Sequence, residues 1–105
     1  MEPTPITLTV GPVTLVCQPS VTAEVADALR AAVPRAVTNW ADVVEAAEKL
    51  PIAPVVQVAV IDRELHALIH LDGAEAAVHV SVPSKAQPYD FLAKVLRALE
   101  QELSV

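Results

Sequence analysis

Residues 54–82 read PVVQVAVIDRELHALIHLDGAEAAVHVSV, and this stretch decides the fold. In it, apolar side chains alternate with other residues in three runs: 54–61, 65–71 and 75–82. A period of two is typical of strands that bury one face. The runs are joined by Asp62-Arg63-Glu64 and by Asp72-Gly73-Ala74, and Asp-Gly is among the strongest signals for a hairpin turn. The stretch therefore predicts a three-stranded antiparallel meander.

Outward from the meander, the pattern predicts two more strands and three helices. Alternating runs at 6–10 and 13–17 flank Gly11-Pro12, which favours a hairpin. Helices are expected over about 23–33, from Thr38 or Asn39 to Leu50, and over about 88–103, with an interruption at Pro34. The order β-β-α-α-β-β-β-α predicts a single α+β domain over 1–105, with a mostly antiparallel sheet and helices packed on it.

This order of elements resembles the outline of the longin, profilin-like and Roadblock architectures. In those, two strands, a helical segment, three strands and a last helix form one five-stranded sheet with helices packed on it. The order also resembles a shortened helix-grip fold. The likeness is an analogy of fold alone and rests on no residue motif. It implies no activity, because such folds host unrelated functions.

Composition narrows the classes of function. The 105 residues are 53% hydrophobic and 19% charged, which is more apolar material than a small domain easily hides and favours self-association. Formal net charge is −6, from 13 acidic and 7 basic residues. Nucleic acids and anionic membranes attract basic surfaces, so we expect neither as a partner.

Cysteine and glycine usage exclude further classes. Cys17 is the single cysteine, so the chain forms no internal disulfide, and its apolar parity predicts a buried, unreactive thiol. The chain begins without the pattern of a signal peptide and has no run of 18 apolar residues, so we expect a cytoplasmic protein. Gly11 and Gly73 are the only glycines, too few for a phosphate-binding loop, and we expect no cofactor.

All three histidines, His66, His70 and His79, lie by parity on the face opposite the valine-rich one. Two registers of the hairpin are open. If Asp72 and Gly73 form the turn, His66 lies across from His79 and His70 across from Glu75. If Gly73 and Ala74 form the turn, His79 lies across from Leu68 and diagonal to both other histidines. In either register His66 and His79 are weak candidates for a metal site that lacks a full tetrahedral ligand set.

Two apparent catalytic motifs fail. Residues 66–70 read HALIH, but a zinc-protease helix needs Glu after the first His, and Ala67 stands there. Ser81 and His79 share one face of one strand, where neighbouring side chains are nearly 7 Å apart, too far for a direct hydrogen bond. We therefore expect a protein without catalytic activity.

The histidine-bearing face also carries apolar side chains. Val55, Ala59, Ile61, Leu68 and Ala77 share it with the histidines, Glu75 and Gln57. A solvated face should be more polar, so either a helix or another copy of the chain is expected to cover it. The favoured hypothesis is a homo-oligomeric interaction or regulatory module, a homodimer or larger, that can also bind a protein partner. The alternative is a small-ligand or metal-binding domain, an enzyme included, that uses the histidine-bearing face of strands 65–71 and 75–82.

Overall fold

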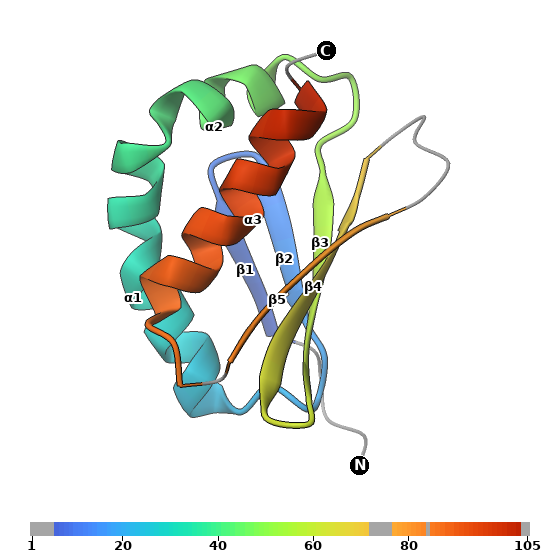
Figure 1. The fold of residues 1–105 in the computed structure, drawn as a ribbon. Helices are drawn as coiled ribbons and strands as arrows, with labels where there is room; N and C mark the ends of the chain where they lie inside the picture. Colours follow the sequence, from blue (N-terminus) through green and yellow to red (C-terminus); the bar gives the residue numbers. More distant parts are fainter. Residues whose placement is uncertain (1–5, 72–76, 84, 104–105) are drawn as a thin grey trace.

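A five-stranded sheet with helices on one of its faces forms the protein (Figure 1). The computed structural model describes residues 6–71, 77–83 and 85–103. The strands lie side by side in chain order: β1 (Ile6–Val10), β2 (Val13–Cys17), β3 (Val55–Ile61), β4 (Glu64–His70) and β5 (Val78–Pro83). Strands β2 and β3 are parallel and the other neighbouring pairs are antiparallel. The predicted α+β class, element order, meander and mostly antiparallel sheet are confirmed.

Both described hairpins have two-residue turns with left-handed backbone. In the turn between β1 and β2, Gly11 has a φ of 59°, as the first central residue of a type II′ turn requires. Between β3 and β4, Asp62 and Arg63 have φ values of 51° and 64°, which fits a type I′ turn. The expected three-residue connection is wrong, because Glu64 already pairs with Ile61.

The helices are α1 (Ala23–Asn39), α2 (Ala41–Glu48) and α3 (Pro88–Leu103). The expected interruption at Pro34 is wrong, since α1 continues for five more residues. Pro34 removes the backbone bond to the carbonyl of Arg30, but its side chain is exposed. The Thr38 hydroxyl donates to the Pro34 carbonyl at 2.9 Å within the same turn. The helix ends instead at Trp40, whose φ of −120° leaves the helical range.

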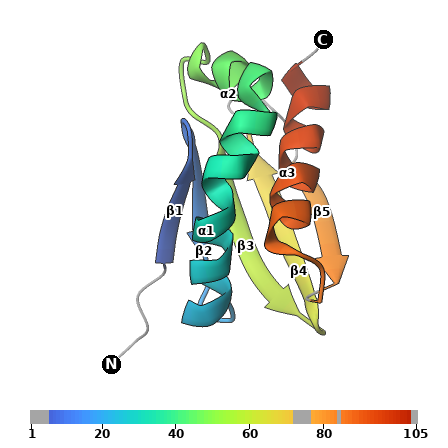
Figure 2. The same cartoon turned by 90° about the vertical axis from the view of Figure 1, so that its left-hand side faces the viewer.

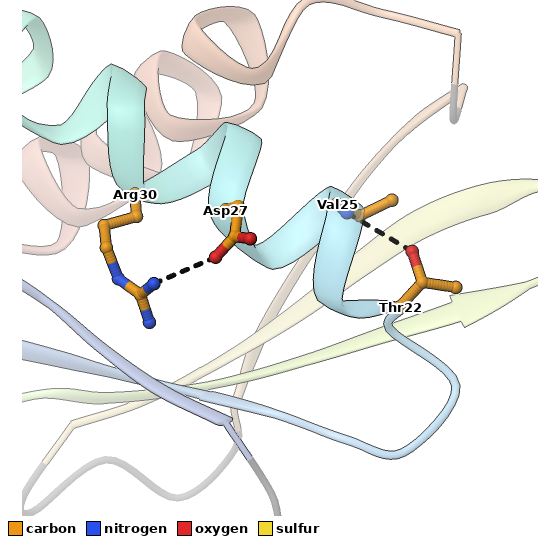
Figure 3. A network of polar contacts seen from close by, with 4 residues as sticks. All are labelled: Thr22, Val25, Asp27 and Arg30. Atoms are coloured by element: carbon orange, nitrogen blue, oxygen red, sulfur yellow. Dashed lines mark hydrogen bonds and ion pairs between the residues drawn. The ribbon is translucent and has the colours of Figure 1, made fainter.

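The start of α1 is fixed by side chains (Figure 3). The backbone N–H of Val25 donates to Thr22 Oγ1 at 3.2 Å, so Thr22 caps the helix. One turn later, Arg30 pairs with Asp27 at 2.9 Å, with both side chains exposed. The cap supports the helix start, whereas an exposed ion pair of this kind adds little.

The core lies between the helices and one face of the sheet (Figure 2). The strands contribute alternate residues, among them Leu15, Val56, Val58, Ala67 and Ile69, and the helices contribute Leu29, Phe91, Leu92, Leu96 and Leu99. Cys17 is buried as predicted. Burial raises the pKa of its thiol, against a smaller opposing effect of the Arg30 charge.

All three helices lie on the same side of the sheet (Figures 1 and 2). Of the two alternatives for the second face, a helix or another copy of the chain, the helix is therefore wrong for the described part of the chain. Among the described helices, none is long and apolar enough to cross a membrane. The uncovered face of the sheet is therefore the candidate functional surface.

Candidate functional site

The uncovered side of the sheet, called the open face here, carries every second residue of each strand. Its residues point away from the helices because successive side chains of a strand alternate between faces. They are Thr7, Thr9, Thr14, Val16, Val55, Gln57, Ala59, Ile61, Glu64, His66, Leu68, His70, His79, Ser81 and Pro83.

Strand register sets predicted site residues in one row. Thr7 pairs with Val16, Val16 with Gln57, Gln57 with Leu68 and Leu68 with His79. This row crosses all five strands, so three of the predicted residues are direct lateral neighbours. Neighbours in such a row have Cβ atoms about 4.5–5.5 Å apart, close enough to form one continuous surface.

Large apolar side chains are exposed on β3 and β4 of the open face, with Val55 and Ile61 at opposite ends of β3. Val55 and Ile61 on β3 are 38% and 53% exposed, and Leu68 on β4 is 38% exposed. The threonines on β1 and β2 border them on one side, as expected for solvated strands. Three large apolar groups on neighbouring strands are unusual for an exposed sheet face, where polar residues normally stand.

His66 and His79 meet beside Leu68, on β4 and β5. Their ring centroids are 5.0 Å apart and their planes are inclined by 21°. Nδ1 of His66 lies 2.8 Å from Nε2 of His79, within hydrogen-bond distance. One of these nitrogens must carry a hydrogen and donate it, and the other must be unprotonated and accept it.

The pairing of β4 with β5 decides between the two predicted registers. Leu68 pairs with His79, so the register in which His66 lies directly across from His79 is wrong. The histidines meet along a diagonal instead. Strand twist makes the two diagonals of an antiparallel pair unequal, and only the one toward His66 closes into a contact.

His70 and Glu75 do not join this pair. His70 is exposed, and its partner in register is Val55 on β3. Glu75 lies outside the described residues. Within the described residues, no group of three or more His, Cys, Asp or Glu side chains could hold a metal ion. The site is therefore a histidine pair beside an apolar patch.

One contact that was not predicted from the sequence fixes the edge of the sheet near the pair. Lys94 Nζ on α3 donates to the backbone carbonyl of Ser81 at 2.8 Å. Ser81 lies on β5, at the end of the strand order, and pairs with His66. Helical periodicity alone does not indicate that the amine of Lys94 reaches a backbone carbonyl 13 residues away in the sequence.

The helical side offers polar contacts of a structural kind. The guanidinium of Arg35 lies 4.3 Å from the ring centre of Tyr89, and Asn39 Nδ2 donates to the Tyr89 hydroxyl at 2.9 Å. Both contacts join α1 to the start of α3. An open hollow beside them is lined partly by Arg35 and Asp90 and holds no nucleophile paired with a base.

Comparison with protein-family models, curated proteins and solved structures finds no match to this chain.

Proposed function

We propose that this chain is a non-catalytic interaction module that forms a homodimer through its open face. The observation that carries the proposal is the exposure of three large apolar side chains, Val55, Ile61 and Leu68, on a sheet face without helices. Exposed apolar surface on a small domain marks an interaction site when it gathers on one face.

Charge supports a second copy as the occupant. Among the described open-face residues, only Glu64 carries a formal charge when His is neutral, although the whole chain has a net charge of −6. Two acidic copies repel each other over most orientations. Contact through the open face brings few charged side chains of the two copies together, so this approach has a low electrostatic cost.

The size of the face fits a weak dimer. Five strands about 4.8 Å apart, with about six residues at about 3.3 Å each, give a flat area of roughly 500 Å² per copy. A face-to-face pair would bury about 1,000 Å² in total, at the lower limit for a specific interface. The related copies would form a two-fold symmetric sandwich with sheets about 10 Å apart.

Pairing through the β5 edge is less favourable. There the Ser81 carbonyl already accepts a hydrogen bond from Lys94, which reaches the edge from α3. Covering the edge of a sheet with a helix is one of the features by which proteins prevent edge-to-edge pairing.

The test is the oligomeric state at micromolar concentrations in a chelating buffer, measured by light scattering after size exclusion and by native mass spectrometry. We expect a concentration-dependent dimer that Leu68→Glu converts to monomer, because two buried carboxylates would face each other. The matched control is Ile52→Glu. Ile52 is 57% exposed but lies between α2 and β3, outside the open face. A wild-type monomer at every concentration, or a dimer that Leu68→Glu leaves intact, would refute the proposal.

A further inference from the structure

The His66–His79 contact brings two ligand-type nitrogens together at the surface. Both come from one chain, on the neighbouring strands β4 and β5, and they are 2.8 Å apart. Neither ring has another hydrogen-bond partner among the described residues. In this contact one nitrogen donates N–H to the lone pair of the other.

This separation is close to that of two ligands on one ion. Zinc binds histidine nitrogen at about 2.0–2.1 Å with tetrahedral angles, which sets two nitrogens about 3.3–3.4 Å apart. The nitrogens would have to separate by about half an ångström, and the rings would have to turn so that both lone pairs point to one ion. Both rings are on a face without covering helices. Neutral histidines with both contacting nitrogens unprotonated can replace their mutual hydrogen bond by two bonds to a cation.

We propose that His66 Nδ1 and His79 Nε2 form a two-nitrogen chelate for a late first-row divalent cation, with Cu²⁺, Zn²⁺ and Ni²⁺ as the fitting ions. Imidazole is a preferred ligand of these metals, whereas Mg²⁺ and Ca²⁺ require oxygen ligands. The described residues supply no third ligand, so water fills the other positions. Both ligands belong to one chain, so a monomer can bind the ion, and the open face that carries them is also the proposed dimer interface.

Competition between metal and protons follows from the same geometry. Each coordinating nitrogen must be unprotonated, so metal affinity falls as the rings take up protons in acid. The charged groups of the neighbouring elements do not offset this effect strongly. Glu64 lies one open-face position from His66 on β4, and Lys94 of α3 is engaged with the Ser81 carbonyl.

The experiment titrates the metal-stripped full chain with ZnSO₄ and with CuSO₄ at pH 7.5 and at pH 5. Binding is measured by calorimetry and by native mass spectrometry. We expect one ion per chain at pH 7.5, tighter binding of Cu²⁺ than of Zn²⁺, and loss of binding at pH 5. His66→Gln and His79→Gln are each expected to weaken binding by at least about tenfold.

The matched control is His70→Gln, on the same face and the same strand as His66 but outside the pair. It should leave metal affinity unchanged. The proposal fails if no ion binds at pH 7.5, or if His70→Gln weakens binding as much as His66→Gln. If no metal ion binds but the dimer persists in chelator, this inference is refuted and the proposed function stands.

Discussion

Replacing Gly11 with alanine should destabilise the fold for two separable reasons. Gly11 has a φ of 59°, and a side chain in this left-handed region costs roughly 1–2 kcal/mol. A Cβ built there would also lie 2.5 Å from Cγ1 of Val44, a buried residue of α2. Overpacking of this kind costs typically about 1–3 kcal/mol. Alanine restricts the unfolded chain and recovers about 0.4–1 kcal/mol, so the net loss should be about 2–4 kcal/mol.

Urea unfolding followed by far-UV circular dichroism and by the fluorescence of Trp40, the only tryptophan, measures this loss. The midpoint of Gly11→Ala should fall by about 1–2 M urea. The matched background is Val44→Ala, which removes the atom that the new Cβ would meet and leaves the backbone strain.

In the Val44→Ala background, Gly11→Ala should cost only about 1 kcal/mol, which is the strain less the gain from the unfolded state. The resulting coupling energy between the two sites is about 1–3 kcal/mol. A Gly11→Ala protein as stable as wild type, or an equal loss in both backgrounds, would show that the turn does not pack against α2 in this way.

Three further predictions concern local structure and pH. Arg63→Gly should raise the free energy of unfolding by about 0.5–1 kcal/mol, and with it the thermal midpoint. Glycine relieves the backbone strain of the φ of 64° in the β3–β4 turn. Thr22→Ala should lower the free energy of unfolding by about 1 kcal/mol through loss of the bond from Val25 N–H, and Thr22→Asn should retain most of it. Burial, opposed by the Arg30 charge, raises the pKa of Cys17, so the unfolded thiol ionises before the folded one. Stability should therefore fall as pH rises above about 8.5, and urea midpoints of Cys17→Ala should show a weaker fall.

The meander could be predicted because its two faces differ in one simple property. Val56 and Val58 on β3, and Ala67 and Ile69 on β4, leave one face wholly apolar, and a shift by one residue would expose all of them. The register of the last hairpin could not be predicted in the same way. A shift by two residues keeps the parity, so the sequence 72–74 is compatible with both arrangements.

The sequence pattern also does not determine which face of the sheet the helices cover. Each helix has an apolar stripe, but the open face carries Val55, Ile61 and Leu68 and is itself partly apolar. The face on which the connecting helices pack depends on which strands are neighbours. Strands β2 and β3 are parallel neighbours, and the 37 residues between Cys17 and Val55 connect them. Local periodicity contains no information on that pairing.

Pro34 shows the limit of a rule applied to one residue. Proline disfavours a helix interior by removing one hydrogen bond and by its ring, at about 3 kcal/mol. The flanking turns of α1 bury Leu29 and Ala36 against the core, and this packing keeps the helix continuous. The sequence places the proline on the exposed side of the helix, but only the packed structure shows that the burial on the other side prevails.

Leu68 connects the two proposals, and its variants separate them. It is the register partner of His79 and lies two residues from His66 on the same face. In Leu68→Glu a carboxylate stands beside both rings and can serve as a third ligand, so Zn²⁺ affinity should rise while the dimer is lost. In Leu68→Lys the dimer should also be lost, but the ammonium repels the cation, so Zn²⁺ affinity should fall. If both variants changed Zn²⁺ affinity in the same direction, the ion would not lie beside Leu68, and the histidine pair would be a surface contact without a metal.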